Sequence, residues 1–269
     1  MTSAKDLVLP LDAYDLNAVE RSVVQTARYH LIERCLSRYG LPFKPHDTRP
    51  VTYPKNASYL GWLGAKQVGT YGYSGPRGQL AEVAAAVDGI RGYLIPPSQD
   101  AVQTGTVKRF RGKPVPPEGC DGEAQRRLNG DAPGPDGVAP AKPHIYKQLY
   151  VYMDDAAEIA YQDERIKAAN AAWSACMRKA GHRYAMPAEA EADPRWASRR
   201  DTEPPTKDEL STAVADERCR LQVNYSGARL AAYADAQRAV IARHKQEVER
   251  LATLQRTRYA NAQKVLDSA

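Results

Sequence analysis

The sequence contains four cysteines, and their spacing limits the chemistry they can perform. They are Cys35, Cys120, Cys176 and Cys219, separated by 85, 56 and 43 residues. Zinc sites usually draw their ligands from closely spaced Cys-x-x-Cys pairs, and no such pair occurs. The spacing therefore argues against a metal centre and leaves disulfide bonds or buried thiols. An even number of cysteines beside long proline- and glycine-rich loops favours two disulfides in an oxidising compartment.

Acidic residues at 154–158 are the one constellation that could bind a divalent cation. On a helix, Asp154 and Glu158 share a face with Asp155 beside them, a geometry that can hold Mg²⁺ against a diphosphate. These five residues resemble the aspartate-rich motif of terpene synthases. The second metal motif of that family is not matched, because Arg178 stands where a carboxylate is required. We expect a solvated helix surface here and keep Mg²⁺ binding as the alternative.

Common signatures of nucleophilic, nucleotide-dependent and zinc-dependent catalysis are missing from the sequence. There is no Walker loop, no Gly-x-Gly-x-x-Gly fingerprint and no His-Glu-x-x-His. Residues 72–75 begin like a nucleophile elbow, but Pro76 stands where the second glycine is required. We therefore predict a non-enzymatic protein with no catalytic residue, no metal and no cofactor.

Aromatic residues supply a candidate binding surface, because the chain has 16 tyrosines but only 2 phenylalanines. Tyrosine-rich irregular surfaces bind carbohydrates and peptides, since the ring contributes contact area and the hydroxyl group a hydrogen bond. The densest group of tyrosine and tryptophan residues comprises Tyr53, Tyr59, Trp62, Tyr71, Tyr73 and Tyr93. All of these except Tyr53 are predicted binding residues. The alternative is a small tyrosine-built core packed against the first helix.

The chain is basic, with 38 Lys and Arg residues against 32 Asp and Glu, a net charge of +6 and a pI near 9.0. The excess is spread along the chain without a motif that reads nucleic acid, so we expect no nucleic-acid partner. The densest basic run is residues 108–113. It could contact phosphates, teichoic acids or anionic lipid headgroups, but a solvated loop is the simpler interpretation.

Hydrophobic periodicity predicts a first helix over residues 17–39. Asn17 and Glu20 have the spacing of a capping box at its start, and Gly40 ends it. Cys35 falls on the apolar stripe of this helix, where a thiol would face inward.

Residues 40–145 contain most of the proline and glycine. Short helices are expected at 58–68 and 79–87, with a turn-rich loop at 69–78. We expect Cys120 to lie in a loop that a cross-link would tie down.

Two long helices are predicted in the C-terminal half, over residues 146–180 and 226–266. Between them, Thr206 and Glu209 have the spacing of a second capping box. Long helices joined by a modest connection pack antiparallel, so we expect a coiled-coil-like hairpin.

The fold class is therefore predicted to be all-α, with an N-terminal helix and irregular region at 1–145 and a long-helix hairpin region at 146–269. A hydrophobic content of 43%, a mean hydropathy of −0.59 and the lack of an apolar run near ~18 residues exclude an integral membrane protein. Residues 1–10 lack the pattern of a signal peptide. The sequence is thus expected to be cytoplasmic or the mature form of an exported protein, and the cysteines favour the second.

Segments around the cysteines resemble a group of actinobacterial exported or lipoprotein-type all-α proteins. The similarity spans roughly residues 20–266 and is carried by 38–40, 119–124, 173–181 and 214–219. It implies export, lipid anchoring through a cysteine outside this sequence, and pairing of the first cysteine with the second and the third with the fourth. It implies no activity.

Together these expectations favour a non-enzymatic, extracytoplasmic protein of the cell envelope that binds a protein or an envelope polymer. One alternative is an accessory or immunity protein beside an exporter. Another is a Mg²⁺-dependent enzyme that acts on a diphosphate or lipid-linked substrate through the acidic cluster.

Overall fold

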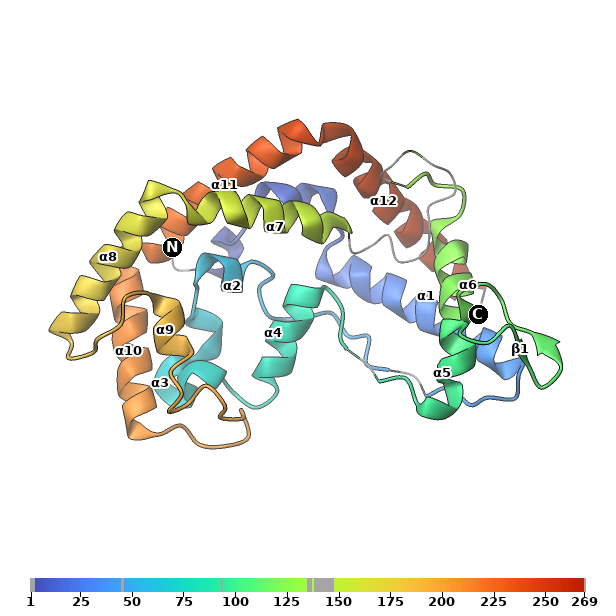
Figure 1. Cartoon of the computed structure of the whole chain (residues 1–269), viewed down its shortest axis with the longest axis horizontal. Coiled ribbons are helices and arrows are strands. Elements are labelled where there is room, and N and C mark those ends of the chain that lie inside the picture. Colours follow the sequence, from blue (N-terminus) through green and yellow to red (C-terminus); the bar gives the residue numbers. More distant parts are fainter. Residues whose placement is uncertain (1–2, 45, 93, 135–136, 138–147, 269) are drawn as a thin grey trace. The chain divides into compact units, whose positions relative to one another are not determined.

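The computed structural model describes residues 3–44, 46–92, 94–134, 137 and 148–268 (Figure 1). Helices predominate in these ranges, where the only strands are the two of one short hairpin, so the predicted all-α fold class is confirmed. Within the same ranges, no helix combines the length and the hydropathy that a membrane span needs.

The chain folds into two compact units, each assembled from three segments. Unit 1 comprises Met1–Ala13, Thr52–Asp88 and Tyr152–Ala242, and unit 2 comprises Tyr14–Val51, Gly89–Val151 and Arg243–Ala269. This division differs from the expected boundary at residue 145. The reason is that α12 (Lys245–Asp267) packs on α1 (Ala18–Ser37), so the last helix belongs with the first.

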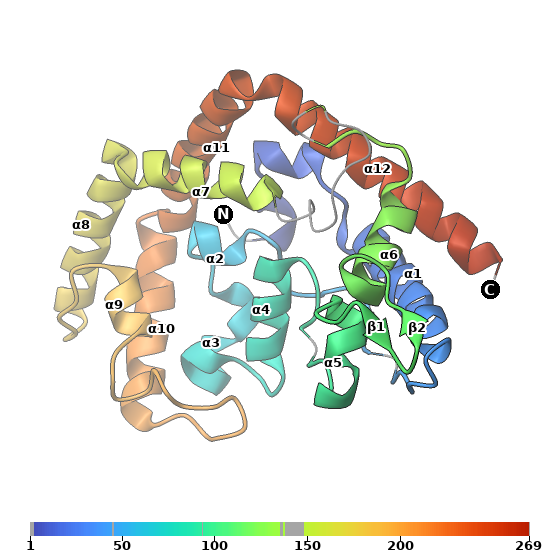
Figure 2. The same ribbon diagram turned by 45° about the vertical axis from the view of Figure 1, so that its right-hand side comes forward.

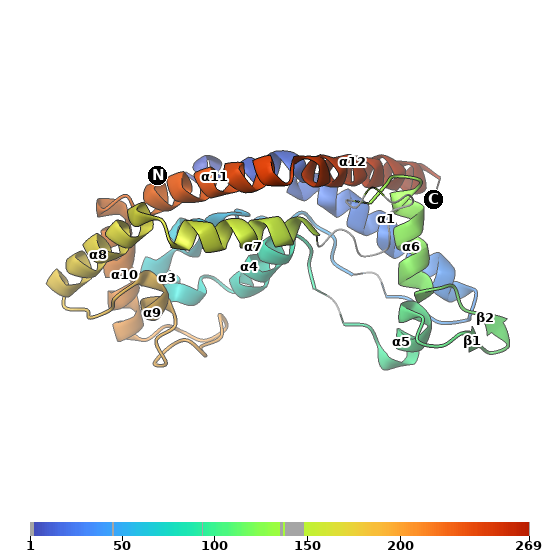
Figure 3. The same cartoon turned by 45° about the horizontal axis from the view of Figure 1, so that its top comes forward.

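Unit 1 is built around α8 (Glu164–Lys179) and α10 (Lys207–Gln222), which pack side by side (Figure 3). Their contact buries Trp173, Met177 and Cys219 in one apolar cluster. The remaining elements of this unit are η1 (Ala4–Asp6), α2 (Ala57–Leu60), η3 (Gly64–Lys66), α3 (Val68–Tyr71), η4 (Gly72–Ser74), α4 (Gln79–Asp88), α9 (Pro187–Glu191) and nearly all of α11 (Tyr225–Arg243). The division between the units falls within η2 (Pro10–Tyr14) and α7 (Gln148–Tyr161).

Both long helices expected from the sequence are interrupted. The first is divided into α7 and α8 because Asp163 adopts an extended backbone and its side chain accepts a hydrogen bond from the Arg165 amide, which caps a new helix. The second is divided into α11 and α12 at His244. The expectation of a hairpin of two uninterrupted helices was therefore wrong. Instead, α8 packs on α10, and α12 packs on α1 and α6 (Gly119–Asn129).

Unit 2 has α1 at its centre, with α6 and α12 packed along it (Figure 2). The predicted capping box at the start of α1 is confirmed, because the Asn17 side chain accepts from the Glu20 amide and the Glu20 side chain accepts from the Asn17 amide. Cys120 lies in α6, so the prediction that it lies in a loop was wrong. The unit is completed by α5 (Pro97–Thr104) and the hairpin of β1 (Arg109–Phe110) and β2 (Lys113–Pro114).

Candidate functional site

The four cysteines form two disulfides, one inside each unit. Cys35 of α1 is bonded to Cys120 of α6, with Cα atoms 5.6 Å apart. Cys176 of α8 is bonded to Cys219 of α10, with Cα atoms 5.7 Å apart. The predicted disulfides and the pairing implied by the resemblance are thus confirmed, and all four cysteines lie in the described residues with none left free. Two such bonds suggest an oxidising, extracytoplasmic environment.

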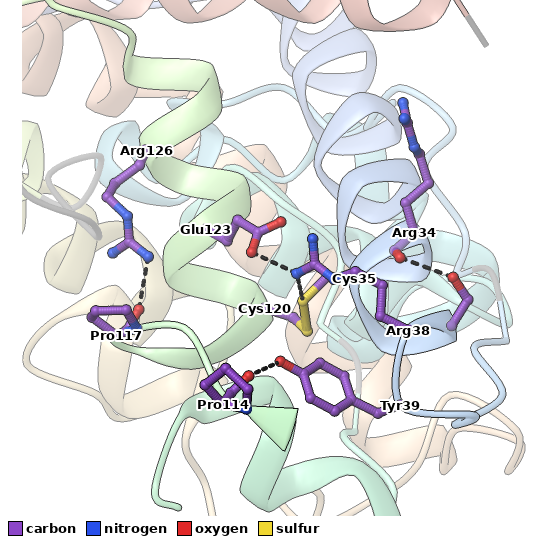
Figure 4. Close-up of a disulfide and its surroundings, with 10 residues drawn as sticks. Arg34, Cys35, Arg38, Tyr39, Pro114, Pro117, Cys120, Glu123 and Arg126 are labelled. Atoms are coloured by element: carbon purple, nitrogen blue, oxygen red, sulfur yellow. Dashed lines mark hydrogen bonds and ion pairs between the residues drawn. A yellow bond between two sulfur atoms is a disulfide. The ribbon is translucent and has the colours of Figure 1, made fainter. Parts of the chain in front are cut away.

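Two charged side chains, Arg38 and Glu123, lie beside the Cys35–Cys120 bond at the C-terminal end of α1 (Figure 4). The guanidinium of Arg38 donates to Glu123 Oε2 at 2.6 Å, and Arg38 Nη2 lies 3.1 Å from Cys35 Sγ. The hydrogen bond to Glu123 raises the pKa of Arg38. The Arg34 side chain, by contrast, extends away from the disulfide.

The β1–β2 hairpin is attached to the same end of α1. Tyr39 Oη donates to the Pro114 carbonyl, and Lys113 Nζ donates to the Arg38 carbonyl, each at 2.6 Å. The basic run 108–113, expected to be a solvated loop, forms this hairpin. Its four cationic side chains are all in exposed residues. The hairpin therefore presents positive charge to solvent and is attached to the end of α1 by these two hydrogen bonds.

The predicted tyrosine-rich binding residues have unlike environments. Tyr73 is only 6% exposed and belongs to a core that forms on α10, not against the first helix as the alternative expected. Tyr59 and Trp62 are half-buried, whereas Tyr71 is exposed. Tyr93 lies outside the described residues. A shared binding surface for these side chains stays a prediction. Tyr73, however, forms a hydrogen bond inside the core.

The hydroxyl group of Tyr73 donates to Asp216, a carboxylate that is fully buried in α10. Asp216 also accepts from Trp173 Nε1 at 2.7 Å and from two nitrogens of Arg220, at 2.6 and 2.8 Å. Burial and the neighbouring Asp216 raise the pKa of Tyr73, so its phenol stays a neutral donor. With four donors on two oxygens, Asp216 has no free acceptor to offer a substrate. We interpret it as the polar centre of the unit 1 core.

Arg220 links this centre to the irregular segment that follows α2. Its guanidinium donates to the Gly61 carbonyl at 3.0 Å and to Glu191 at 2.9 Å, and Lys66 Nζ also lies 2.9 Å from Glu191. Burial alone would raise the pKa of Glu191, but the charges of Lys66 and Arg220 outweigh it and hold the pKa at about 2. Glu191 is therefore a carboxylate at neutral pH.

A cavity beside Arg220 has a volume of about 30 Å³ and is lined by Trp62, Glu217 and Leu221, among others. That volume holds roughly one water molecule. Burial and the adjacent Asp216 raise the pKa of Glu217. The space is too small for a carbohydrate or peptide side chain, so a ligand of Trp62 would have to bind outside it.

Glu209 is a second buried carboxylate, and the sequence indicated a different role for it. Thr206 Oγ1 accepts from the Glu209 amide at 3.1 Å, as the expected capping box requires. The Glu209 carboxylate instead pairs with Arg199 through two 2.7 Å contacts and accepts from the Tyr73 amide at 3.0 Å. Only half of the predicted box forms. A Cβ at Gly72 would come within 2.1 Å of Glu209 Oε1, which explains the glycine at that position.

The acidic cluster offered as the alternative metal site lies on α7. Asp154 and Glu158 are exposed and Asp155 is half-buried. Within the described ranges, no three acidic, histidine or cysteine side chains are grouped closely enough to hold a metal ion.

The two units differ in charge. Unit 1 has 17 basic and 19 acidic residues, a net charge of −2, whereas unit 2 has 21 basic and 13 acidic residues, a net charge of +8. The even spread of charge along the sequence conceals this difference, because each unit is assembled from three segments. The positive excess of the protein therefore belongs to unit 2.

Comparison with known proteins identifies no matching family model, no similar curated protein and no similar solved structure.

Proposed function

We propose that the protein is a non-enzymatic, extracytoplasmic component of the cell envelope that binds an envelope polymer or a protein partner. The two disulfides support the location, since such bonds persist where the environment is oxidising. The internal hydrogen bonds of Asp216 and Glu209 support a structural use of the buried carboxylates of unit 1.

The positive charge of unit 2 is the observation that carries the binding function. A net charge of +8 on one unit, with the exposed cations of the 108–113 hairpin among its sources, creates a field that attracts anions. Teichoic acids and other phosphate-bearing envelope polymers, or an acidic protein surface, have the complementary charge. Arginine, which supplies many of these cations, pairs with phosphate and carboxylate groups through two parallel hydrogen bonds.

The location is tested by measuring the state of the thiols in protein taken directly from its native cell. Fractionation should recover the protein outside the cytoplasm, and its intact mass should lie about 4 Da below that of the reduced chain, two hydrogens per bond. Four free thiols in a cytoplasmic fraction would contradict the proposal.

Binding is tested by sedimenting the purified, oxidised full chain with insoluble cell-wall material before and after its phosphate-bearing polymers are removed. The double variant Lys108→Gln/Arg109→Gln should reduce the retained fraction severalfold. The matched control is Lys179→Gln/Arg218→Gln, which removes the same charges from exposed positions in unit 1. Equal retention of both variants, or retention that survives polymer removal, would count against an anionic polymer as the partner.

A further inference from the structure

A cavity of about 310 Å³ lies within unit 2, where the C-terminal parts of three helices meet. It is lined by residues of α1, α6 and α12 and by the residues directly after α6 and α12. These residues are Leu31, Arg34, Arg127, Gly130, Asn261, Lys264, Val265 and Ser268. Its volume falls at the lower end of the range for small-molecule sites, roughly 300–1,000 Å³. The cavity is therefore large enough for more than a bare inorganic ion.

Each of the three helices contributes one cation to this cavity: Arg34 from α1, Arg127 from α6 and Lys264 from α12. Within the described residues, no carboxylate lines it and none of the three cations makes an ion pair. Their neighbours behave differently, because Arg38 pairs with Glu123 and Arg126 pairs with Glu118. The three cations that line the cavity, all in exposed residues, thus differ from these two neighbours in having no carboxylate that offsets their charge.

Helix dipoles account for part of this arrangement. A cation in the last turn of a helix stabilises the exposed carbonyl groups there, and Arg34, Arg127 and Lys264 all occupy such turns. The dipole effect acts on each helix separately. It does not explain why three such cations, all in exposed residues, line one concavity that has no carboxylate among its described lining residues. Their combined field attracts anions from solvent. An anion in the cavity would offset these three charges.

We propose that this cavity binds the phosphate group of a phosphoester. Two guanidinium groups can each donate two parallel hydrogen bonds to phosphate oxygens, and the lysine adds a third positive charge. Leu31 and Val265 provide an apolar wall for the carbon part of the ester. Asn261 holds one side of the site in place, since its amide donates to the Leu128 carbonyl at 2.9 Å. The proposal rests on the proposed function only for the source of the ester, and the site itself is independent of it.

Calorimetric titration of the oxidised full chain with inorganic phosphate and with glycerol 3-phosphate tests the site. We expect glycerol 3-phosphate to bind with a dissociation constant of about 1 mM or tighter, and more tightly than inorganic phosphate because it reaches the apolar wall. Arg34→Gln, Arg127→Gln and Lys264→Gln should each weaken binding at least about fivefold, since each removes a charge-assisted contact. Without ligand these variants should fold normally, because all three substitutions are at exposed residues.

The matched control is Arg256→Gln, which removes one exposed charge from α12 outside the cavity and should change affinity less than twofold. Equal weakening by this control would overturn the proposal in favour of a diffuse positive field, and so would the lack of any binding at 10 mM ligand, about ten times the expected constant.

Vesicles that contain phosphatidylglycerol identify the source of the phosphate group. Vesicle binding that glycerol 3-phosphate displaces, and that the three variants lose, indicates a lipid headgroup. Glycerol 3-phosphate binding without vesicle binding indicates a soluble ester or a polymer. Vesicle binding that the variants retain, with no binding of the free ester, would contradict the site. Failure of the proposed function would appear in other measurements, as free thiols or a cytoplasmic location in the native cell. Neither result would change the calorimetric titration of the purified, oxidised chain.

Discussion

Unit 1 and unit 2 use charged residues in opposite ways. In unit 1, Glu209, Asp216 and Arg220 are buried and each is bonded to several internal partners. Unit 2 also contains a buried ion pair, Arg28 with Asp121 at 3.0 Å, but its excess of +8 includes many cations in exposed residues. Both units have one disulfide between two packed helices. A disulfide between two packed helices is therefore combined with a buried polar core in unit 1 and with a positively charged surface in unit 2.

This contrast predicts which charge substitutions should change stability and which should change binding. Charge substitutions in unit 1 remove bonds that the core needs, so they should act on folding. Charge substitutions on the surface of unit 2 should act on binding and leave folding nearly unchanged.

Removing either disulfide should produce the largest effect on stability. The chain-entropy estimate gives about 4–5 kcal/mol for the Cys35–Cys120 loop and about 4 kcal/mol for the Cys176–Cys219 loop, from sequence separations of 85 and 43. Hydrogen exchange of the paired alanine variants should show loss of protection in α1 and α6 for the first and in α8 and α10 for the second. Equal loss across both units in either variant would contradict two separately stabilised units.

Asp216→Asn should destabilise unit 1 by about 3 kcal/mol, because Arg220 would lose one of its two carboxylate partners and the amide NH2 group of the asparagine cannot accept the hydrogen bonds that Asp216 accepts. Urea unfolding measures the change. Asp154→Asn is the control, since Asp154 is exposed on α7 and its substitution should cost no more than about 0.5 kcal/mol. Similar costs for the two variants would refute the assignment of Asp216 as the polar centre of the core.

The sequence predicted those elements that a local signal defines. The capping box of Asn17 and Glu20 formed because both partners lie within one turn. The interruption at Asp163 was missed although the residue is a favourable N-cap, because the apolar periodicity continues across it and outweighed the cap in the prediction. Nothing in the local pattern at His244 indicated an end of helix.

Tertiary contacts explain the other differences. Glu209 lies three residues after a threonine cap, which predicts a capping box. Its carboxylate instead pairs with Arg199, a charged partner from a loop. The tyrosine group was predicted from density along the chain, which cannot distinguish Tyr73 in the core from Tyr71 at the surface. The cations of the 310 Å³ cavity come from three helices far apart in sequence, so only the fold brings them together.

Gly130→Ala should have a smaller, local effect in unit 2. Gly130 has φ +56° and ψ −137°, a conformation that favours glycine, and a Cβ there would lie 3.0 Å from Asn261 Nδ2. We expect a loss of about 1–2 kcal/mol in urea unfolding and weaker phosphoester binding, because Asn261 would be displaced. Gly92→Ala in the same unit meets no atom within 4 Å and has no positive φ, so it should be neutral. A neutral Gly130→Ala would show that this edge of the cavity adapts freely.

Acid should weaken unit 1 through Glu191, by the smallest amount of the effects considered. Its pKa is lowered from 4.5 to about 2 because Lys66 and Arg220 outweigh the cost of burial. A carboxylate with a lowered pKa contributes stability above its unfolded pKa and loses that contribution as pH falls through the folded value. Unit 1 should therefore lose about 1 kcal/mol between pH 5 and 2, allowing for the 34% exposure of the side chain. Glu191→Gln should flatten the pH dependence of urea unfolding in that window, whereas Glu158→Gln, an exposed control on α7, should leave it unchanged. If both variants kept the wild-type slope, the link between the Asp216 centre and the segment after α2 would not depend on the charge of Glu191.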